Sequence, residues 1–317
     1  MRALTGTIQS YDAPATQEIA DHVGLPVEQI VRFDGNTSPQ ALPSSRAEAL
    51  TEELGRIHTY PHGGYPQLER AIADYAGVAP ENVVLGAGAD DLILLVTRSF
   101  ASPGDTVAVA NDPTYPMFPI SVWIAGASVG DDNPVLTITC RPNNPTGELA
   151  ELPSARPLVV DEAYFEYSGA SAVDLIEDGV IVLRTFSKAF GLAGARAGYA
   201  LAGRDVAAEL NQRQHPAPLS TLSAALALAG LESPPDVAPI LEERERMAGR
   251  LRDLGRQPLP SAANFLYVPV DDPQAQYDLL LHQGLAVRPV RGGIRITIRT
   301  LKDDERLLDA LASSRGA

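Results

Sequence analysis

Five short apolar runs, each followed closely by polar residues, constrain the fold of this chain more than any other feature. Helical patterns or crossover segments separate the runs, which are Val83–Leu85, Thr106–Ala110, Val135–Thr139, Leu158–Val160 and Val180–Leu183. Strands of a parallel sheet are covered on both faces and are therefore apolar throughout. Ligands of such sheets bind beyond the carboxyl ends of the strands. We predict an α/β fold with a mostly parallel sheet flanked by helices, and a site at that edge.

The chain is too long for a single small core, with 317 residues. After Ala202 the order of predicted helices and strands changes to that of a smaller α+β unit, with strands at 264–268, 285–288 and 294–298. Helical periodicity also predicts helices near residues 15–22 and over 44–57. We predict an N-terminal arm at 1–34 that packs with the small domain, a large domain at 35–203 and a small domain at 204–317.

Composition excludes several classes of protein. The net charge of −15 argues against a nucleic-acid surface, which needs clustered lysine and arginine. The single cysteine, Cys140, excludes an intrachain disulfide, and the five histidines show no metal-ligand spacing, so we expect no metal site. Met1–Ser10 has no signal-peptide core, and no apolar stretch reaches the ~18 residues of a membrane span. We therefore expect a cytoplasmic protein with no membrane partner.

Lys188 is the most unusual candidate for a chemical role. It follows the last apolar run, among small and apolar residues in the segment Val182–Gly198. Desolvation lowers the pKa of a lysine toward the neutral amine that forms Schiff bases. The alternative is an ordinary surface lysine on a loop. If Lys188 forms an imine with an aldehyde cofactor, that cofactor is pyridoxal 5′-phosphate, which withdraws electrons only while its ring nitrogen is protonated.

The other strand ends supply what such a cofactor needs. Asp161 could keep the ring nitrogen protonated, although an aspartate there could also be a turn or cap residue. The turn Gly86–Asp90 joins a strand to a helix, an arrangement that binds phosphate but is also common as a plain turn. The remaining candidates are Tyr164 and Asn144 at the ring oxygen, Tyr115 on the ring face, and Ser187 and Arg196 at the phosphate.

Several motifs occur together and in order. They are YPHGGYPQLERAIA (60–73), GAGADDLI (86–93), NDPTY (111–115), PNNPTG (142–147), VVDEAY (159–164), RTFSKAFGLAGARAGY (184–199), SAANFLYV (261–268) and RITI (295–298). With them the chain resembles the class I/II, fold-type I PLP-dependent aminotransferases over about residues 35–300. Within these enzymes it is most similar to the histidinol-phosphate aminotransferase-like branch.

The resemblance implies a role for each matching residue. Lys188 would be the Schiff-base lysine and proton shuttle, Asp161 would pair with the ring nitrogen, and Tyr164 would contact the ring oxygen. Arg295, Asn36 and Arg288 are assigned to the substrate, although Arg288 could equally be a solvated surface charge. The cofactor-binding set implied is Tyr60, Ala87, Gly88, Ala89, Tyr115, Asn144, Asp161, Tyr164, Ser187, Lys188 and Arg196. Tyr60 would reach the cofactor of a neighbouring subunit, which implies a homodimer with shared active sites.

The chain departs from the family pattern in two places. The segments 116–143 and 148–160 are shorter than usual, and we expect a helix on one face of the sheet to be lost or reduced. Arg299 stands where the family's RITIGT motif has glycine, with Arg288 and Arg291 nearby. These departures bear on the substrate more than on the cofactor chemistry.

The resemblance favours an aminotransferase that moves an amino group from an amino acid or a histidinol-phosphate-like amine to a 2-oxo acid such as 2-oxoglutarate. Aromatic amino acids, histidine and specialised-metabolism substrates remain open as donors. One alternative is a lyase of the threonine-phosphate decarboxylase type, because the cofactor motifs are shared. Another is a catalytically idle binding or regulatory protein, which the presence of Lys188, Asp161, Tyr164 and Arg196 disfavours.

Overall fold

The protein is described by a computed structural model that covers residues 14–40, 50–51 and 53–313. Its larger sheet has seven strands in the order β2-β8-β7-β6-β5-β3-β4. All neighbouring pairs are parallel except those of β8, which runs antiparallel to β2 and β7. The strands are β2 Val83–Gly86, β3 Thr106–Val109, β4 Ser128–Val129, β5 Leu136–Cys140, β6 Leu158–Asp161, β7 Val180–Thr185 and β8 Gly198–Leu201.

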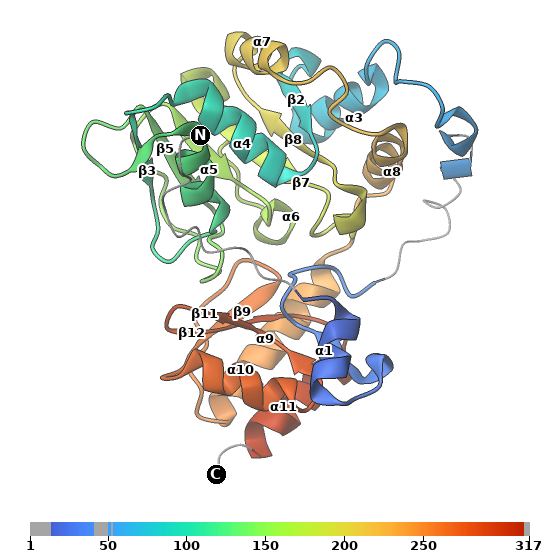
Figure 1. Cartoon of the computed structure of the whole chain (residues 1–317), viewed down its shortest axis with the longest axis vertical. Helices are drawn as coiled ribbons and strands as arrows, with labels where there is room; N and C mark the ends of the chain where they lie inside the picture. Colours follow the sequence, from blue (N-terminus) through green and yellow to red (C-terminus); the bar gives the residue numbers. More distant parts are fainter. Residues whose placement is uncertain (1–13, 41–49, 52, 314–317) are drawn as a thin grey trace, which may run out of the picture.

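Helices cover both faces of this sheet (Figure 1). The central strand β7 is buried along its length: Val180 and Val182 join one apolar cluster, and Ile181 and Leu183 join the other, as the twofold alternation of a strand requires. One cluster includes α3 and α8, and the other includes α4, α5 and α7. The helices are α3 Pro66–Ala76, α4 Ala89–Phe100, α5 Met117–Ala125, α7 Arg204–Arg213 and α8 Thr221–Glu232, with the short α6 Phe165–Ser168 after β6.

A second, smaller unit follows in the chain and lies below the larger one in Figure 1. Its antiparallel sheet has the order β11-β12-β9 and packs against α9, α10 and α11 around a separate apolar core. The N-terminal stretch joins this unit, because β1 pairs in parallel with β10. The elements are α1 Thr16–Val23, β1 Val31–Arg32, α9 Ala238–Asp253, β9 Phe265–Pro269, α10 Pro273–Leu281, β10 Leu285–Ala286, β11 Arg288–Val290, β12 Gly293–Thr297 and α11 Leu301–Ser313. The described residues also include four 3₁₀ turns, η1 Val27–Gln29, η2 Pro80–Asn82, η3 Val173–Asp178 and η4 Ala193–Ala195.

The predicted α/β class and the mostly parallel sheet are confirmed. The expected loss of a helix is also confirmed, since residues 141–157 contain neither helix nor strand, whereas the other shortened segment retains α5. The single strand predicted at 285–288 is wrong: it is two short strands that belong to different sheets. The predicted helix at 44–57 falls partly outside the described residues, and the domain limits stay a prediction.

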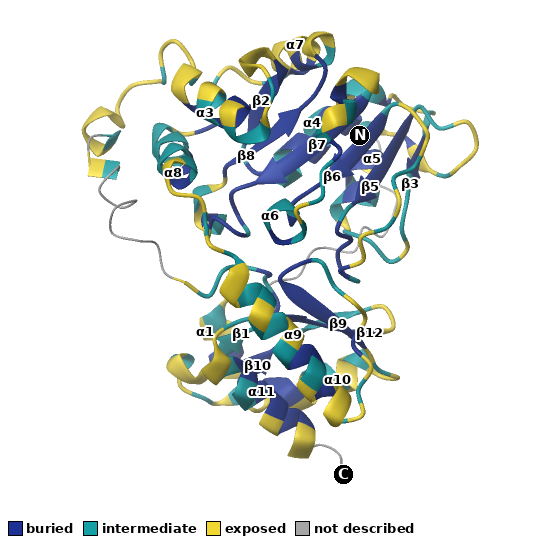
Figure 2. Cartoon of the chain, turned by 180° about the vertical axis from the view of Figure 1, so that it is seen from behind, coloured by how far each residue is buried: buried dark blue, intermediate teal, exposed yellow. Residues whose placement is uncertain are grey.

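The fold brings the ends of β5, β6 and β7 toward the smaller unit. Figure 2 shows the buried strands of the large sheet pointing into the region above β9 and β12. A hydrogen bond from Arg295 on β12 to Asn144, in the loop after β5, links the two units directly. The predicted edge of the sheet is therefore closed by residues of the C-terminal unit.

Candidate active site

Lys188 lies in the loop after β7, and its Nζ donates a hydrogen bond to the carbonyl oxygen of Gly35 at 3.1 Å. Burial, with a further contribution from the Arg295 guanidinium, lowers the pKa of Lys188 to about 8. A lysine with this pKa has a much larger neutral fraction near pH 7 than an exposed lysine. The amine is therefore suited to attack a carbonyl carbon.

Asp161 ends β6, which pairs with β7, the strand that the Lys188 loop follows. Its side chain is almost fully buried, and Oδ1 accepts the backbone N–H of Ala163 at 3.0 Å. Burial raises the pKa of Asp161 to about 7. A cation beside this carboxyl group would favour its ionised form. The position of Asp161 therefore suits a group that is positively charged when protonated.

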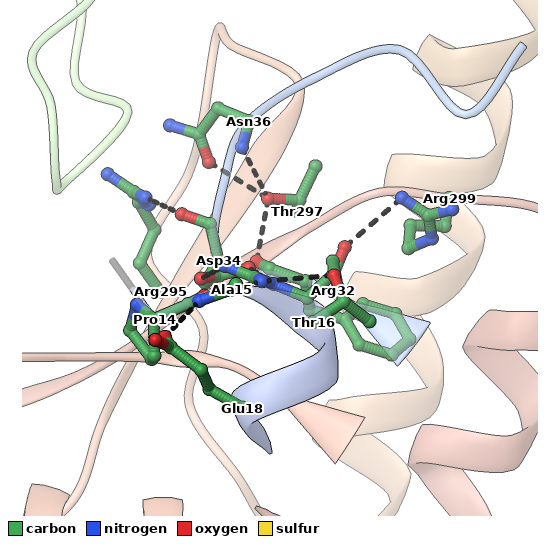
Figure 3. Close-up of polar contacts among 11 residues, drawn as sticks. Pro14, Ala15, Thr16, Glu18, Arg32, Asp34, Asn36, Arg295, Thr297 and Arg299 are labelled. Atoms are coloured by element: carbon green, nitrogen blue, oxygen red, sulfur yellow. Dashed lines mark hydrogen bonds and ion pairs between the residues drawn. The ribbon is translucent and has the colours of Figure 1, made fainter. Parts of the chain in front are cut away.

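Arg295 brings a buried positive charge to the same region. Its Nη1 donates to Asn144 Oδ1 at 2.6 Å. Its Nη2 donates to the carbonyl oxygen of Asp34, as Figure 3 shows. Its Nε has no hydrogen-bond partner, although the residue is only 4% exposed. A buried donor without a partner is costly. Arg295 therefore has capacity for an anion that enters the site.

Tyr164 is buried beside these residues. Its hydroxyl accepts a hydrogen bond from Asn36 Nδ2 at 2.9 Å, and its ring packs edge-to-face on Phe265 with centroids 5.1 Å apart. The Nζ of Lys188 lies 5.9 Å from the centroid of the same ring. Burial raises the pKa of Tyr164 well above its ordinary value, so the phenol keeps its proton.

The glycine turn places a helix terminus beside Arg196. Helix α4 begins at Ala89, so the first-turn N–H groups point out of its end without helical acceptors. Gly88 has φ +90°, and a Cβ atom there would lie 2.9 Å from Arg196 Nη2. The close approach of backbone and guanidinium explains why this position needs glycine. Together they form a cradle for an anion.

The backbone N–H groups of this turn are not equivalent. The N–H of Ala87 donates to Asp91 Oδ2 at 2.9 Å, and that of Gly88 donates to the carbonyl oxygen of Gly86 at 2.8 Å. Both are thus already used inside the turn. Of the three predicted phosphate ligands in the turn, Ala89 is the one whose N–H lies at the helix end.

Asp90 was missed by the sequence analysis. Its Oδ1 accepts from the Tyr115 hydroxyl at 2.8 Å, and its Oδ2 accepts from Arg196 Nη2 at 3.3 Å. Asp90 therefore connects the predicted ring-stacking tyrosine with the predicted phosphate arginine. The signal was the acidic pair that follows the glycine turn. Ser187, also assigned to the phosphate, is buried next to Lys188, and its Oγ accepts from Thr185 Oγ1 at 3.0 Å.

The structure does not bring every predicted residue into this cluster. Tyr60 is 78% exposed and lines a cavity of about 540 Å³ that contains none of the other predicted site residues. Arg288 is half-buried and lies directly opposite Arg295 in the antiparallel pair β11–β12. Of the nearby arginines, Arg291 pairs with Asp112 at 2.9 Å on the surface. Arg299 donates hydrogen bonds to Asp303 and to the carbonyl oxygen of Arg32 in β1.

Within the described ranges, no group of three or more histidine, cysteine, aspartate or glutamate side chains is placed to hold a metal ion. None of the helices that the structure describes combines the length and apolarity needed to cross a bilayer.

Comparison with known proteins decides the family. The sequence model described as "Aminotransferase class I and II" matches residues 28–131 and 124–311. The chain belongs to the class I and II aminotransferases. The predicted resemblance is thereby confirmed.

Relatives of this aminotransferase include two proteins named histidinol-phosphate aminotransferase. One, from Thermoanaerobacter sp. (strain X514), is 34% identical, with 88% of this chain and 92% of the relative covered. The other, from Thermococcus gammatolerans, is 35% identical, with 90% of this chain and 92% of the relative covered.

Solved structures support the same fold. The histidinol-phosphate aminotransferase from Sinorhizobium meliloti, in complex with pyridoxal-5′-phosphate, has a TM-score of 0.84 and 26% identity, and covers 99% of this chain and 97% of its own. The L-threonine-O-3-phosphate decarboxylase from Porphyromonas gingivalis has a TM-score of 0.78 over 90% of this chain and 98% of its own. At 19% identity, the latter shows a shared fold only.

Proposed function

We propose that this aminotransferase uses pyridoxal 5′-phosphate to move an amino group from a histidinol-phosphate-like donor to a 2-oxo acid such as 2-oxoglutarate. The observation that carries the proposal is the placement of Lys188, Asp161 and Arg295 at one end of the large sheet, with the pKa of Lys188 lowered to about 8. When bound, the cofactor withdraws electrons from the donor carbon that loses its proton.

The residues present fit this cofactor. Lys188 would hold its aldehyde carbon and Asp161 its ring nitrogen, while Tyr164 and Asn144 would contact the ring oxygen. Tyr115 would cover the ring face. The phosphate would be held by Arg196, Ser187 and the N–H groups at the start of α4. The cradle beside Gly88 and the unpartnered Nε of Arg295 provide for two anions, one of the cofactor and one of the substrate.

The protein groups divide the work of the reaction. Arg295 binds the donor's anionic group and orients its amine toward Lys188. The Nζ of Lys188, once free, takes the proton from the donor's Cα carbon. Asp161, ionised beside the protonated ring nitrogen, stabilises the charge that develops as that proton leaves. The buried surroundings keep water away from these steps and strengthen the interactions between the charges.

A half-reaction with single donors tests the substrate and the reaction type together. The protein, loaded with cofactor, is mixed with histidinol phosphate, histidine, phenylalanine or threonine phosphate without any 2-oxo acid. Histidinol phosphate is expected to convert the cofactor to pyridoxamine phosphate in one turnover. Release of carbon dioxide from threonine phosphate, with the cofactor unchanged, would favour the decarboxylase instead.

We also propose a cytoplasmic homodimer in which Tyr60 reaches the partner subunit's cofactor. Tyr60 is highly exposed and lines a cavity that none of the other predicted site residues lines, so its side chain can contact a second subunit. The test mixes Lys188→Ala protein with Tyr60→Ala protein. If the site is shared, an equal mixture should recover about a quarter of wild-type activity. Random exchange of subunits makes about half of the dimers hybrids, and each hybrid has one complete site of two. No recovery after verified subunit exchange would refute sharing.

A further inference from the structure

The short segment Phe33–Asn36 leaves β1 and runs directly along the candidate site. The carbonyl oxygen of Asp34 accepts from Arg295, and that of Gly35 accepts from Lys188 Nζ at 3.1 Å. Two consecutive backbone groups thus contact two of the site's cations. A side chain on this segment is well placed to act on a third site residue.

Asn36 has such a side chain. The residue is 1% exposed and has φ +51°, a left-handed conformation that asparagine tolerates better than most residues. Its Nδ2 donates to the Tyr164 hydroxyl at 2.9 Å, across 128 residues of sequence. Its carbonyl oxygen accepts from Asn264 Nδ2 at 3.1 Å. The backbone and the amide group of Asn36 are therefore both held in place.

Thr297, near the end of β12, fixes the direction of the Asn36 amide. Its Oγ1 accepts the backbone N–H of Asn36 at 2.9 Å, and lies 3.0 Å from Asn36 Oδ1 and 2.6 Å from the carbonyl oxygen of Phe33 (Figure 3). The single hydroxyl proton serves one of these two oxygens at a time. With Oδ1 turned toward Thr297, Nδ2 points away from it and meets Tyr164.

We propose that Asn36 is a positioning residue that sets the direction of the Tyr164 hydroxyl proton. A phenol oxygen that accepts a hydrogen bond from Asn36 Nδ2 keeps its own single proton for a different acceptor. Tyr164 is then prepared to donate to the ring oxygen of the cofactor. This inference depends on the proposed function, and it assigns Asn36 to Tyr164 rather than to the substrate.

The proposal makes the smaller unit part of the cofactor site. Thr297 belongs to the three-stranded sheet, whereas Tyr164 follows β6 of the large sheet. Asn36 is the link between them, because it bonds to both. In this cluster the Thr297 hydroxyl forms hydrogen bonds with residues 33 and 36 and none with Tyr164. A change at Thr297 should nevertheless alter the electronic properties of the bound cofactor, because Asn36 transmits it to Tyr164.

A pH titration of the visible absorption band of the cofactor-loaded protein tests the proposal without measuring turnover. A hydrogen bond donated to the ring oxygen favours the deprotonated chromophore, so loss of the Tyr164 hydroxyl should raise the pKa of the band. Asn36→Ala should raise it in the same direction, by about 0.5–1 pH unit for one hydrogen bond. The double variant with Tyr164→Phe should titrate like Tyr164→Phe alone.

Thr297 provides the matched pair of variants. Thr297→Val removes the hydroxyl and should raise the pKa of the band, again only when the Tyr164 hydroxyl is present. Thr297→Ser keeps the hydroxyl and should restore the wild-type value. This pair decides the question even if Asn36→Ala does not fold, which thermal unfolding of the cofactor-free protein would show.

Two outcomes would overturn the proposal. In one, Asn36→Ala and Thr297→Val leave the pKa of the band unchanged while Tyr164→Phe raises it. In the other, they shift it equally with and without the Tyr164 hydroxyl. Absence of any visible band in the wild-type protein would refute the proposed function itself, which is a different result.

Discussion

The ion pair between Arg184 and Glu162 gives a stability prediction whose size follows from the structure. Arg184 Nη2 lies 3.0 Å from Glu162 Oε2, and the two side chains are 2% and 0% exposed. Glu162 also accepts from Ser171 Oγ at 2.9 Å and from the N–H of Ala172 at 2.6 Å. Arg184→Met would leave the carboxylate with these two donors but no cation. Breaking a buried pair from one side costs about 3–5 kcal/mol in the free energy of unfolding.

The cost of Arg184→Met should depend on pH. Burial already raises the pKa of Glu162, and the Arg184 guanidinium opposes that rise. Without the guanidinium, the pKa of Glu162 in the folded protein moves further above its value in the unfolded chain. The folded variant then binds more protons than the unfolded chain. Its stability is then greatest in acid and falls as the pH rises through the interval between those two pKa values. The deficit should therefore be larger at pH 8 than at pH 5.

Urea unfolding of the cofactor-free protein, followed by circular dichroism at pH 5 and pH 8, measures this effect. Adding Glu162→Gln to Arg184→Met should recover most of the loss at pH 8, because no buried charge remains. The matched control is Arg204→Met, which removes the exposed pair between Arg204 and Glu81 and should cost about 0.5 kcal/mol or less. An Arg184→Met deficit as small as that of the control, with no pH dependence, would show that the buried pair stabilises the fold no more than an exposed pair does.

Three further substitutions address the site. Gly88→Ala should weaken cofactor binding by about tenfold or more, because φ is +90° and the new Cβ would lie 2.9 Å from Arg196 Nη2. A fluorescence titration of the cofactor-free protein with pyridoxal 5′-phosphate measures the Kd, and an unchanged Kd would contradict this prediction. Asp161→Asn should lower kcat by about 10²–10³-fold. Without cofactor, Asp161→Asn should be more stable than the wild type in urea unfolding at pH 8, but not at pH 4. The pKa of Asp161 is about 7 in the folded protein and lower in the unfolded chain, so the wild type loses stability as the pH rises between these two pKa values. Arg295→Lys should raise KM for an anionic donor about 10–100-fold with a smaller change in kcat, since lysine cannot keep the bonds to Asn144 and Asp34 and also bind the anion; steady-state kinetics with equal KM would argue against the assignment.

The large sheet could be predicted because its strands are buried on both faces. Runs such as Val180–Leu183 are apolar at every position, and the polar residues after them fall at the carboxyl edge, where Asp161 and Lys188 are found. The strand β8 was missed because Gly198–Leu201 begins at the end of the motif at 184–199, where glycine and alanine interrupt the apolar pattern. The segment 285–288 was wrongly predicted as one strand, because periodicity does not show which of two sheets a short run joins.

The contacts within the site were less accessible from sequence. Lys188 and Gly35 are 153 residues apart, and the contact uses a backbone oxygen, which no residue type reveals. Arg184 and Glu162 each follow an apolar run, yet their pairing depends on the register between β6 and β7. Asn36 could be selected as a site residue, but its partner Tyr164 follows a strand of the large sheet, whereas its partner Thr297 belongs to the three-stranded sheet. Such links depend on tertiary packing rather than local pattern.

Lys188 is expected both to bind the cofactor and to move the donor's proton. The most direct test compares the wild-type protein with Lys188→Ala, both mixed with pyridoxal 5′-phosphate, by absorption spectroscopy and then by single-turnover kinetics with histidinol phosphate. We predict a visible band of lysine-bound cofactor in the wild type that disappears when the donor is added. We predict no such band and no proton transfer in Lys188→Ala. Full turnover by Lys188→Ala would contradict this role of the lysine.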